Sequence, residues 1–273
     1  SYAVSIEYTE PHQKKEDIKE LIKKYYKKQS LAGVILVGDL PYAEYQWMKE
    51  TMVSDFYYQD IEDLCKEGAV CDSSILLRPF WISRISPPTS MDQILALKEY
   101  FKKSHEYKIG KFKANGGYMA YMPLDENNYA DYWHEKLISQ KVYSNKKSKI
   151  TKNKAEYLSY IKQPFEFAFV SAHGDQRYLQ GDITSNDIEL SNPLIFTFTS
   201  CSVGDFRDSE YMAGKHLFSG NTLFIEASSV PHWDDTSIGL EYIKGLKAGL
   251  PIFEAQNLDL RAHMAYVWLG DPT

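Results

Sequence analysis

Apolar side chains recur at helical spacing between residues 16 and 28, with lysines on the opposite face, and this pattern predicts a helix. An alternating run at 2–8 predicts a strand before that helix, and the continuous apolar run Gly33–Val37 predicts a buried strand after it. A strand, a helix and a strand in this order are typical of a parallel sheet covered by helices. The chain therefore opens as an α/β fold.

Residues 40–73 lack a clear hydrophobic period and predict a long irregular loop. After this loop, predicted strands alternate with predicted helices up to the C-terminus. Thr89 or Ser90, and later Thr151, are expected to cap the helices that follow them. The lysine-rich stretch 144–154 is expected to be exposed. The further strands expected are 75–85, 118–122, 141–143 and 222–227, and the further helices are about 90–107, 129–140, 152–161, 211–218, 236–247 and 255–266.

A basic, glycine-containing connector at 108–117 is the best candidate for a boundary within the chain. It predicts an N-terminal α/β subdomain over 1–112 and a C-terminal subdomain over 113–273. No internal repeat is visible.

Two apolar runs, at 167–172 and 194–199, are rich in aromatic and β-branched residues and predict the central buried strands. The first run is followed by His173 and Gly174, and the second by Ser200 and Cys201. Because ligands bind just outside the carboxyl ends of parallel strands, the imidazole and the thiol could share one crevice. An ordinary thiol is only slightly ionised at neutral pH, and a neighbouring imidazole can raise that fraction and protonate a leaving amine. The pattern therefore predicts cysteine nucleophilic catalysis.

Gly174 lets the backbone come close to a substrate carbonyl, so its N–H is expected to form an oxyanion hole with the N–H of Cys201. The alternative interpretation keeps Cys201 as a small core side chain and His173 as a hydrogen-bonded turn residue.

The residues SAHGD at 171–175 and TSCS at 199–202 resemble the gingipain family of cysteine peptidases, in the caspase–gingipain clan. The resemblance implies a three-layer αβα, caspase/gingipain-like fold with mostly parallel sheets and flanking helices. It also implies a cysteine endopeptidase with a Cys201–His173 dyad, a thioester acyl-enzyme and a catalytic C-terminal subdomain. Further pieces that match in order are LVGD at 36–39, SDFYY at 54–58, ISRI at 82–85, ASS at 227–229 and LGDP at 269–272.

The same resemblance implies a primary pocket for a basic (Arg/Lys) side chain. It gives Asp131 as the acid that receives the guanidinium, with Asp125 as the second choice, and Trp233 as an aromatic wall. Asp131 in the first turn of a helix and Trp233 in the core are the alternatives. The family glutamate proposed to orient the histidine corresponds to Ala120 here, so a third catalytic member has to come from elsewhere or is missing.

The composition describes an ordinary globular chain: of 273 residues, 44% are hydrophobic and 25% are charged. The net charge of −6 argues against a nucleic-acid partner and favours cationic ligands, while the resemblance implies a peptide or protein substrate. No apolar run approaches the ~20 residues of a membrane span. The chain starts directly in a strand-like run without a signal peptide, so we expect a processed or trimmed piece of a longer protein. The resemblance implies a secreted or cell-surface location.

Three cysteines allow one disulfide and one free thiol. Cys65 and Cys71 bracket a short loop and could be bridged in an oxidising compartment, whereas three reduced cysteines in a cytosolic protein remain the alternative. The cysteines and histidines lack the spacing of a zinc site, and no cofactor is expected. A structural calcium ion is conceivable near a group of four carboxylates, Asp55, Asp60, Glu62 and Asp63, although an acidic surface loop is the favoured explanation.

Three other functions stay open. A sortase-like transpeptidase of the same family would replace the water of the second step by an amine. A non-catalytic binding domain would keep the fold and use the crevice for a ligand, and a metal-dependent hydrolase is the most distant possibility.

Overall fold

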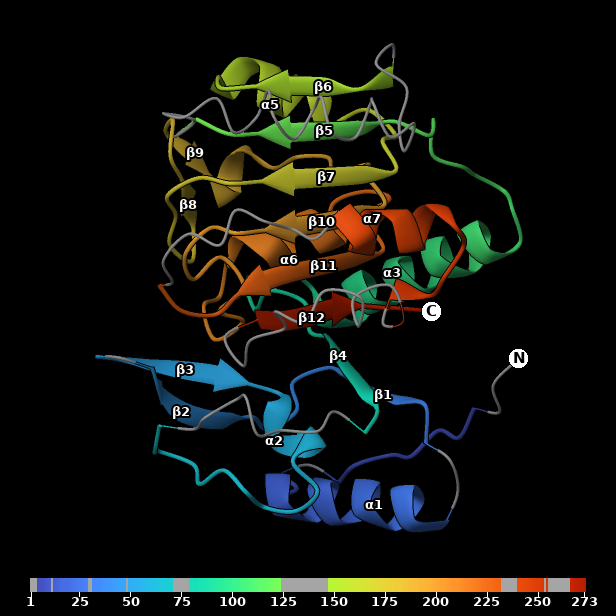
Figure 1. Cartoon of the computed structure of the whole chain (residues 1–273), viewed down its shortest axis with the longest axis vertical. Coiled ribbons are helices and arrows are strands. Elements are labelled where there is room, and N and C mark those ends of the chain that lie inside the picture. Colours follow the sequence, from blue (N-terminus) through green and yellow to red (C-terminus); the bar gives the residue numbers. More distant parts are fainter. Residues whose placement is uncertain are drawn as a thin grey trace.

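The computed structural model describes residues 4–10, 12–28, 31–47, 49–70, 79–123, 147–231, 240–252, 254 and 266–273. Figure 1 shows one sheet through the middle of the molecule, with helices on both sides. The helices are α1 (Lys15–Lys28), α2 (Phe56–Gln59), α3 (Gln93–Lys108), α5 (Lys154–Tyr160), α6 (Met212–Phe218), α7 (Leu240–Lys247) and the 3₁₀ turn η3 (Ser185–Asp187). The strands are β1 (Gly33–Val37), β2 (Ala43–Trp47), β3 (Glu50–Ser54), β4 (Trp81–Ile85), β5 (Tyr118–Tyr121), β6 (Lys149–Thr151), β7 (Phe167–Val170), β8 (Tyr178–Leu179), β9 (Ile183–Thr184), β10 (Ile195–Phe198), β11 (Phe224–Ser228) and β12 (Tyr266–Gly270).

Eight strands form the main sheet in the order β1-β4-β12-β11-β10-β7-β5-β6. Only the β11–β12 pair is antiparallel, and all other neighbours run parallel. Two small antiparallel hairpins, β2–β3 and β8–β9, stand outside this sheet. Figure 1 shows β8–β9 at the edge toward which the arrows of β5 and β7 point. The predicted α/β class with a mostly parallel sheet is confirmed.

Alternate residues of the central strands face two separate cores, which is why these strands read as continuous apolar runs. On one face, side chains such as Val170 and Phe198 pack with Tyr157 of α5 and Leu217 of α6. On the other face, Phe167 and its neighbours pack with residues of and after α7. Helices therefore cover both faces, and the predicted three-layer αβα arrangement is confirmed.

The predicted helix at 16–28 and the predicted strand Gly33–Val37 are confirmed. The strand expected at 2–8 is wrong over its described part: residues 4–8 form no strand, and Val4, Ile6 and Tyr8 are highly exposed. Alternation alone does not make a strand when no neighbouring strand accepts the backbone hydrogen bonds.

The expected irregular loop at 40–73 is also wrong, since it holds the β2–β3 hairpin and α2. Two caps differ as well. Asp92 caps α3 by accepting the N–H of Leu95, and Asn153 caps α5 by accepting the N–H of Glu156. Further strands that the patterns did not predict are β6 in the lysine-rich stretch, β8, β9 and β12.

The main sheet continues across the predicted boundary near residue 112. Strands β1 and β4 precede that boundary, and β12, from the C-terminal end, pairs beside β4 through Leu269 and Arg84. The division into subdomains 1–112 and 113–273 stays a prediction. Three of the expected elements lie wholly or mostly outside the described residues: the helix at 129–140, the strand at 141–143 and the last helix, at 255–266.

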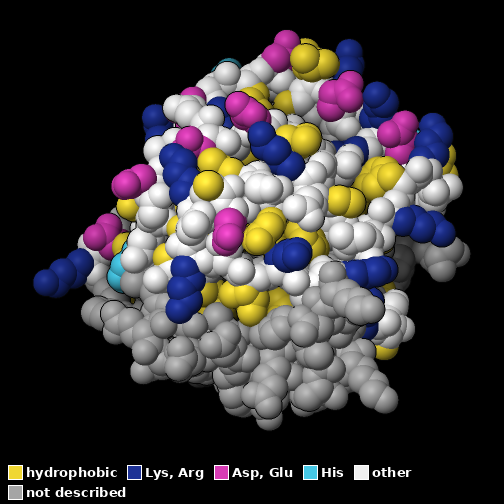
Figure 2. Space-filling view, turned by 90° about the horizontal axis from the view of Figure 1, so that it is seen from above, with side chains coloured by type: hydrophobic (Ala, Val, Ile, Leu, Met, Phe, Trp, Pro, Cys, Tyr) yellow, Lys and Arg dark blue, Asp and Glu magenta, His cyan; other side chains and the backbone are white. Residues whose placement is uncertain are grey.

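Seen from the β6 end, the described surface carries lysine and arginine side chains interspersed with aspartate and glutamate (Figure 2). Over the described part of that face no large area of one sign is present, in keeping with the modest net charge of −6. Within the same described residues, no helix combines the length and apolar character needed to cross a bilayer.

Candidate active site

The candidate catalytic residues follow two neighbouring parallel strands. Strands β7 and β10 pair up to Val170 and Phe198, which stand opposite each other, and the ladder continues with the N–H of Thr199 donating to the carbonyl of Val170 at 2.9 Å. His173 and Cys201 each stand three residues beyond that last pair. Adjacent strands are about 4.8 Å apart, so the imidazole and the thiol leave the sheet from neighbouring points of one edge.

The segment after β7 lies directly against the segment after β10. A β-carbon added to Gly174 would lie 3.3 Å from Cβ of Ser200 and 3.1 Å from a methyl of Val203, the residues on either side of the Cys201–Ser202 pair. The same added atom would be 2.9 Å from the carbonyl oxygen of Tyr178. Only glycine fits between these groups without a shift, which supports the expectation that position 174 requires a close backbone approach.

The histidine segment is held in a small antiparallel ladder. The N–H of Gln180 donates to the carbonyl of His173 at 2.8 Å, and the N–H of Asp175 donates to the carbonyl of Tyr178 at 3.0 Å. Gly174 bridges Leu179 between these two bonds. At such a position the residue's own N–H points away from the partner strand. The Gly174 N–H is therefore directed out of the hairpin, as an oxyanion donor requires.

Cys201 is half-buried, is not part of a disulfide, and stands at the start of a tight turn over 201–204. Ser202 adopts the left-handed conformation with φ of +54°. The turn is bonded to the end of β11 and the residues that follow it: the N–H of Gly204 donates to the carbonyl of Ser228 at 2.7 Å, and the N–H of Ser202 to that of Val230 at 3.1 Å. The thiol is thus neither sealed in the core nor oxidised, so the core alternative for Cys201 is not supported.

A second histidine, His216 on α6, lies fully buried beneath β10. One ring nitrogen is 2.9 Å from the Tyr157 hydroxyl and the other is 2.9 Å from the Ser191 hydroxyl. Burial lowers the pKa of His216 to about 3, so its imidazole is neutral. This residue is a structural core histidine, whereas His173 is exposed at the strand edge.

In the part of the chain that the structure describes, no side chain stands out as a candidate third member beside His173 and Cys201. Ala120, at the family's glutamate position, lies buried in β5 opposite Phe169. The carboxylate of Asp175 accepts the backbone N–H of Arg177 at 2.9 Å and is used in the turn. Among these described residues the imidazole of His173 has no hydrogen-bond partner.

Two arginines near the site were not singled out from the sequence. Arg177 contacts Asp208 and Glu210, and Arg207 contacts Asp205 and Glu44. Their position in the sequence could have pointed to them, because each arginine follows an aspartate by two residues in the first loop after a central strand.

The carboxylates considered for a calcium site bind separate partners. Asp55 is buried and paired with Arg84 at 2.6 Å, Asp60 accepts the N–H groups of Leu64 and Cys65, and Asp63 is paired with Lys19. The described residues contain no group of three or more His, Cys, Asp and Glu side chains arranged to hold a metal ion. Asp125, Asp131 and Trp233 lie outside the described residues, as does Cys71, so the pocket and the Cys65–Cys71 bridge stay predictions.

Comparison with known protein families gives a match for the chain. The model of peptidase family C25 matches residues 2–227. The chain belongs to peptidase family C25. This is the gingipain family of cysteine peptidases, and the resemblance seen in the residues around His173 and Cys201 is therefore confirmed at the level of the family.

Two solved structures resemble this C25 peptidase over 95% of its length. The Arg-specific cysteine proteinase gingipain R (RgpB) is 18% identical with a TM-score of 0.66, and 68% of that chain is covered. A complex of the Porphyromonas gingivalis RgpB pro- and mature domains gives 17% identity, a TM-score of 0.67 and 69% coverage. At 17–18% sequence identity, the similarity to these two structures establishes the fold of the chain alone. No curated protein matches the chain in sequence.

Proposed function

We propose that this C25 peptidase cleaves peptide bonds with Cys201 as the nucleophile and His173 as the group that moves protons. The observation that carries the proposal is the register of β7 and β10, because it leaves the exposed imidazole of His173 and the half-buried thiol of Cys201 equally far beyond the last strand pair. A nucleophile and a proton-transfer group that start from adjoining rigid strands are the minimum equipment for covalent acyl transfer.

In the first step the Cys201 sulfur, as thiolate, attacks the scissile carbonyl carbon. The imidazolium of His173 gives its proton to the leaving amine as the C–N bond breaks, and a thioester joins the enzyme to the acyl half of the substrate. Water then attacks the thioester and passes one proton to the imidazole, and the C–S bond breaks to release the carboxylic acid and restore the thiolate beside the imidazolium.

The developing oxyanion needs preorganised donors. The N–H of Gly174, directed out of its hairpin, and the N–H of Cys201 are the proposed pair. Both belong to segments that touch at Ser200 and Val203, which supports a fixed spacing between them.

We further propose a preference for arginine or lysine before the cleaved bond. Support comes from the resemblance that assigns Asp131, or Asp125, as the acid of the pocket and Trp233 as its wall, and from the Arg specificity named for the RgpB structure. The proposed substrate is a peptide or protein, the reaction as written uses no cofactor, and the proposed location is secreted or at the cell surface.

The test is cleavage of a mixed peptide library by the wild type and by Cys201→Ala and His173→Ala. We expect cleavage after basic residues by the wild type only, and a covalent adduct of a peptidyl acyloxymethyl ketone on Cys201 that is absent from Cys201→Ala. Added amine that appears joined to the acyl half would instead reveal transpeptidation. A wild type that neither cleaves peptides nor reacts with the probe would overturn the proposal in favour of a binding domain.

A further inference from the structure

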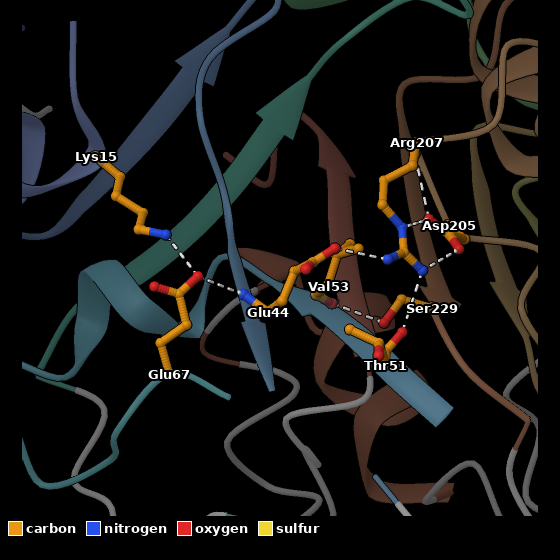
Figure 3. A network of polar contacts seen from close by, with 8 residues as sticks. All are labelled: Lys15, Glu44, Thr51, Val53, Glu67, Asp205, Arg207 and Ser229. Carbon is orange, nitrogen blue, oxygen red and sulfur yellow. Dashed lines mark hydrogen bonds and ion pairs between the residues drawn. The ribbon is translucent and has the colours of Figure 1, made fainter. Parts of the chain in front are cut away.

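The loop that carries Cys201 is fastened to the β2–β3 hairpin through one arginine. The Arg207 guanidinium donates to both carboxylate oxygens of Asp205, at 2.9 and 2.8 Å, and reaches across to Glu44 of β2 at 2.8 Å. It also donates to the carbonyl of Thr51 in β3 at 3.1 Å. Figure 3 shows the guanidinium lying between the Asp205 side and the hairpin side of this network.

Asp205 is the residue that closes the turn begun by Cys201. Its N–H donates to the carbonyl of Ser202 at 3.0 Å, and its side chain is 4% exposed. The hydrogen bonds to Asp205, which have the largest effect, and the hydrogen bond to Glu44 raise the pKa of Arg207 well above its ordinary value. A buried carboxylate gripped by a planar fork of donors is a strong and geometrically selective pair.

The turn needs such support because Ser202 holds a left-handed backbone, with φ of +54°, without being a glycine. Such a conformation persists only where the surroundings determine it. The neighbouring segment contributes as well: Ser202 and Gly204 are bonded to the backbone of Val230 and Ser228, and the Ser229 hydroxyl donates to the carbonyl of Val53 in β3 at 2.8 Å. Figure 3 shows Ser229 and Arg207 reaching the same strand.

The hairpin itself is braced from behind. The Glu67 carboxylate accepts the N–H of Glu44 at 3.1 Å and pairs with Lys15 of α1 at 2.5 Å. Next to Arg207, Phe206 packs edge-on against Tyr42 and under the Arg84 guanidinium, at 4.5 Å from its central carbon. Two successive side chains of the nucleophile loop are therefore seated on the part of the chain that precedes residue 112.

We propose that Arg207 is a positioning residue for the reaction, which holds the Cys201 turn on the β2–β3 hairpin in the geometry that thiol attack requires. The inference rests on the proposed function for its catalytic meaning, while the positioning of Cys201 is measurable without substrate turnover. A small displacement of a reacting group lowers a rate strongly, so the residue matters for the chemical step more than for substrate binding.

The test compares Arg207→Ala, Arg207→Lys and the milder Glu44→Gln with the wild type. The control is Lys162→Ala, which removes an ion pair of similar length to Glu189, 3.1 Å, between the segments that precede β7 and β10, at the opposite end of these strands from the thiol. The measurements are kcat and KM on a peptide substrate, the alkylation rate of Cys201 by iodoacetamide, amide exchange of residues 202–206, and the melting temperature.

For Arg207→Ala we expect kcat to fall on the order of 100-fold with a smaller change in KM, as for a reacting group moved by about 1 Å. Faster exchange of the 202–206 amides and a changed alkylation rate accompany it. Arg207→Lys restores only part of kcat, because a single ammonium does not replace the planar fork. Glu44→Gln is expected to lower kcat less than Arg207→Ala does, and Lys162→Ala is expected to leave kcat unchanged.

If Arg207→Ala lowers only the melting temperature, and keeps kcat, alkylation and amide exchange within twofold of the wild type, Arg207 is merely structural and the inference is overturned. A wild type without peptidase activity is a different result. It would refute the proposed function, while exchange and alkylation would still decide whether Arg207 positions Cys201.

Discussion

Arg177, four residues after His173, reaches across to Asp208, seven residues after Cys201. Its Nε lies 2.7 Å from one carboxylate oxygen and 2.9 Å from the other, and its outer nitrogen is 3.3 Å from Glu210. The backbone joins the same two loops, since the N–H of Met212 donates to the carbonyl of Gln176 at 2.6 Å. The loops that carry the imidazole and the thiol are thus tied to each other directly.

The Arg177–Asp208 ion pair predicts an effect on kcat that depends on salt concentration. Arg177→Ala is expected to lower kcat roughly tenfold at most, because the pair is half exposed and exposed ion pairs contribute little. High salt screens the pair in the wild type, so the difference from Arg177→Ala should shrink as salt rises from about 0.05 to 1 M. The measurement is kcat at several salt concentrations. Lys162→Ala, which removes an exposed pair with Glu189 elsewhere, is the control, and an equal loss there would contradict the prediction.

Gly174 offers a sharper test of the contact between the two loops. Gly174→Ala places a methyl 2.9 Å from the Tyr178 carbonyl and close to Val203, so one loop has to move. We expect kcat/KM to fall on the order of 100-fold, as for a misplacement of about 1 Å, with only a small loss of stability. Gly110→Ala is the control. That glycine has φ of +74° and no neighbour within 4 Å, so the substitution strains the backbone but leaves activity unchanged. Equal activity of both variants would argue against a close approach at 174.

The central strands and their reactive ends were predictable because the information is local. In 167–170 and 195–198 every residue is apolar or β-branched, as expected of strands packed on both faces, and His173 and Cys201 each follow three residues later. The flanking motifs could also be recognised in the sequence. The sequence did not predict that two of them are in contact, through the buried ion pair between Asp55 of SDFYY and Arg84 of ISRI.

The elements that sequence reasoning missed depend on distant partners. Strands β2 and β3 carry charged residues such as Glu44 and Glu50, and β6 lies in a lysine-rich stretch, so periodicity gives no signal. β12 is a strand because β11 and β4 accept it from both sides. The reverse holds at the N-terminus, where an alternating run finds no neighbour. The roles of Arg177 and Arg207 likewise arise from contacts between loops about 30 or more residues apart, up to 163 for Arg207 with Glu44.

The Asp55–Arg84 pair predicts a large loss of stability when it is broken from one side. Arg84 is fully buried, binds Asp55 through two nitrogens and donates to the carbonyls of Leu40 and Pro41. Burial disfavours its charge, but the charge of Asp55 and the hydrogen bonds to it outweigh this and raise the pKa of Arg84. Asp55→Asn leaves the guanidinium without its counter-charge and should lower the free energy of unfolding by about 3–5 kcal/mol.

Chemical denaturation with guanidinium measures that loss. Asp63→Asn is the control, because Asp63 is mostly exposed and its pairs with Lys19 and Lys23 should contribute less than about 1 kcal/mol. The double variant Asp55→Leu with Arg84→Met should recover part of the stability, since neither charge is then buried. A single variant as stable as the wild type would show that Arg84 finds another counter-charge.

His216 predicts how stability depends on pH. Its pKa of about 3 in the folded protein lies below the ordinary value near 6.5, so between these two values the unfolded chain binds a proton that the folded protein does not. Stability from this group is complete above pH 6.5 and is lost as the pH falls toward 3, by about 1.4 kcal/mol for each pH unit. His216→Gln keeps a donor and an acceptor for Tyr157 and Ser191 but does not titrate, so it should be less stable at pH 7 and show a flatter decline between pH 6.5 and 4. The measurement is urea unfolding across that window, with the exposed His105→Gln as the matched control. Identical slopes for the wild type and His216→Gln would mean that the buried imidazole takes up its proton without unfolding.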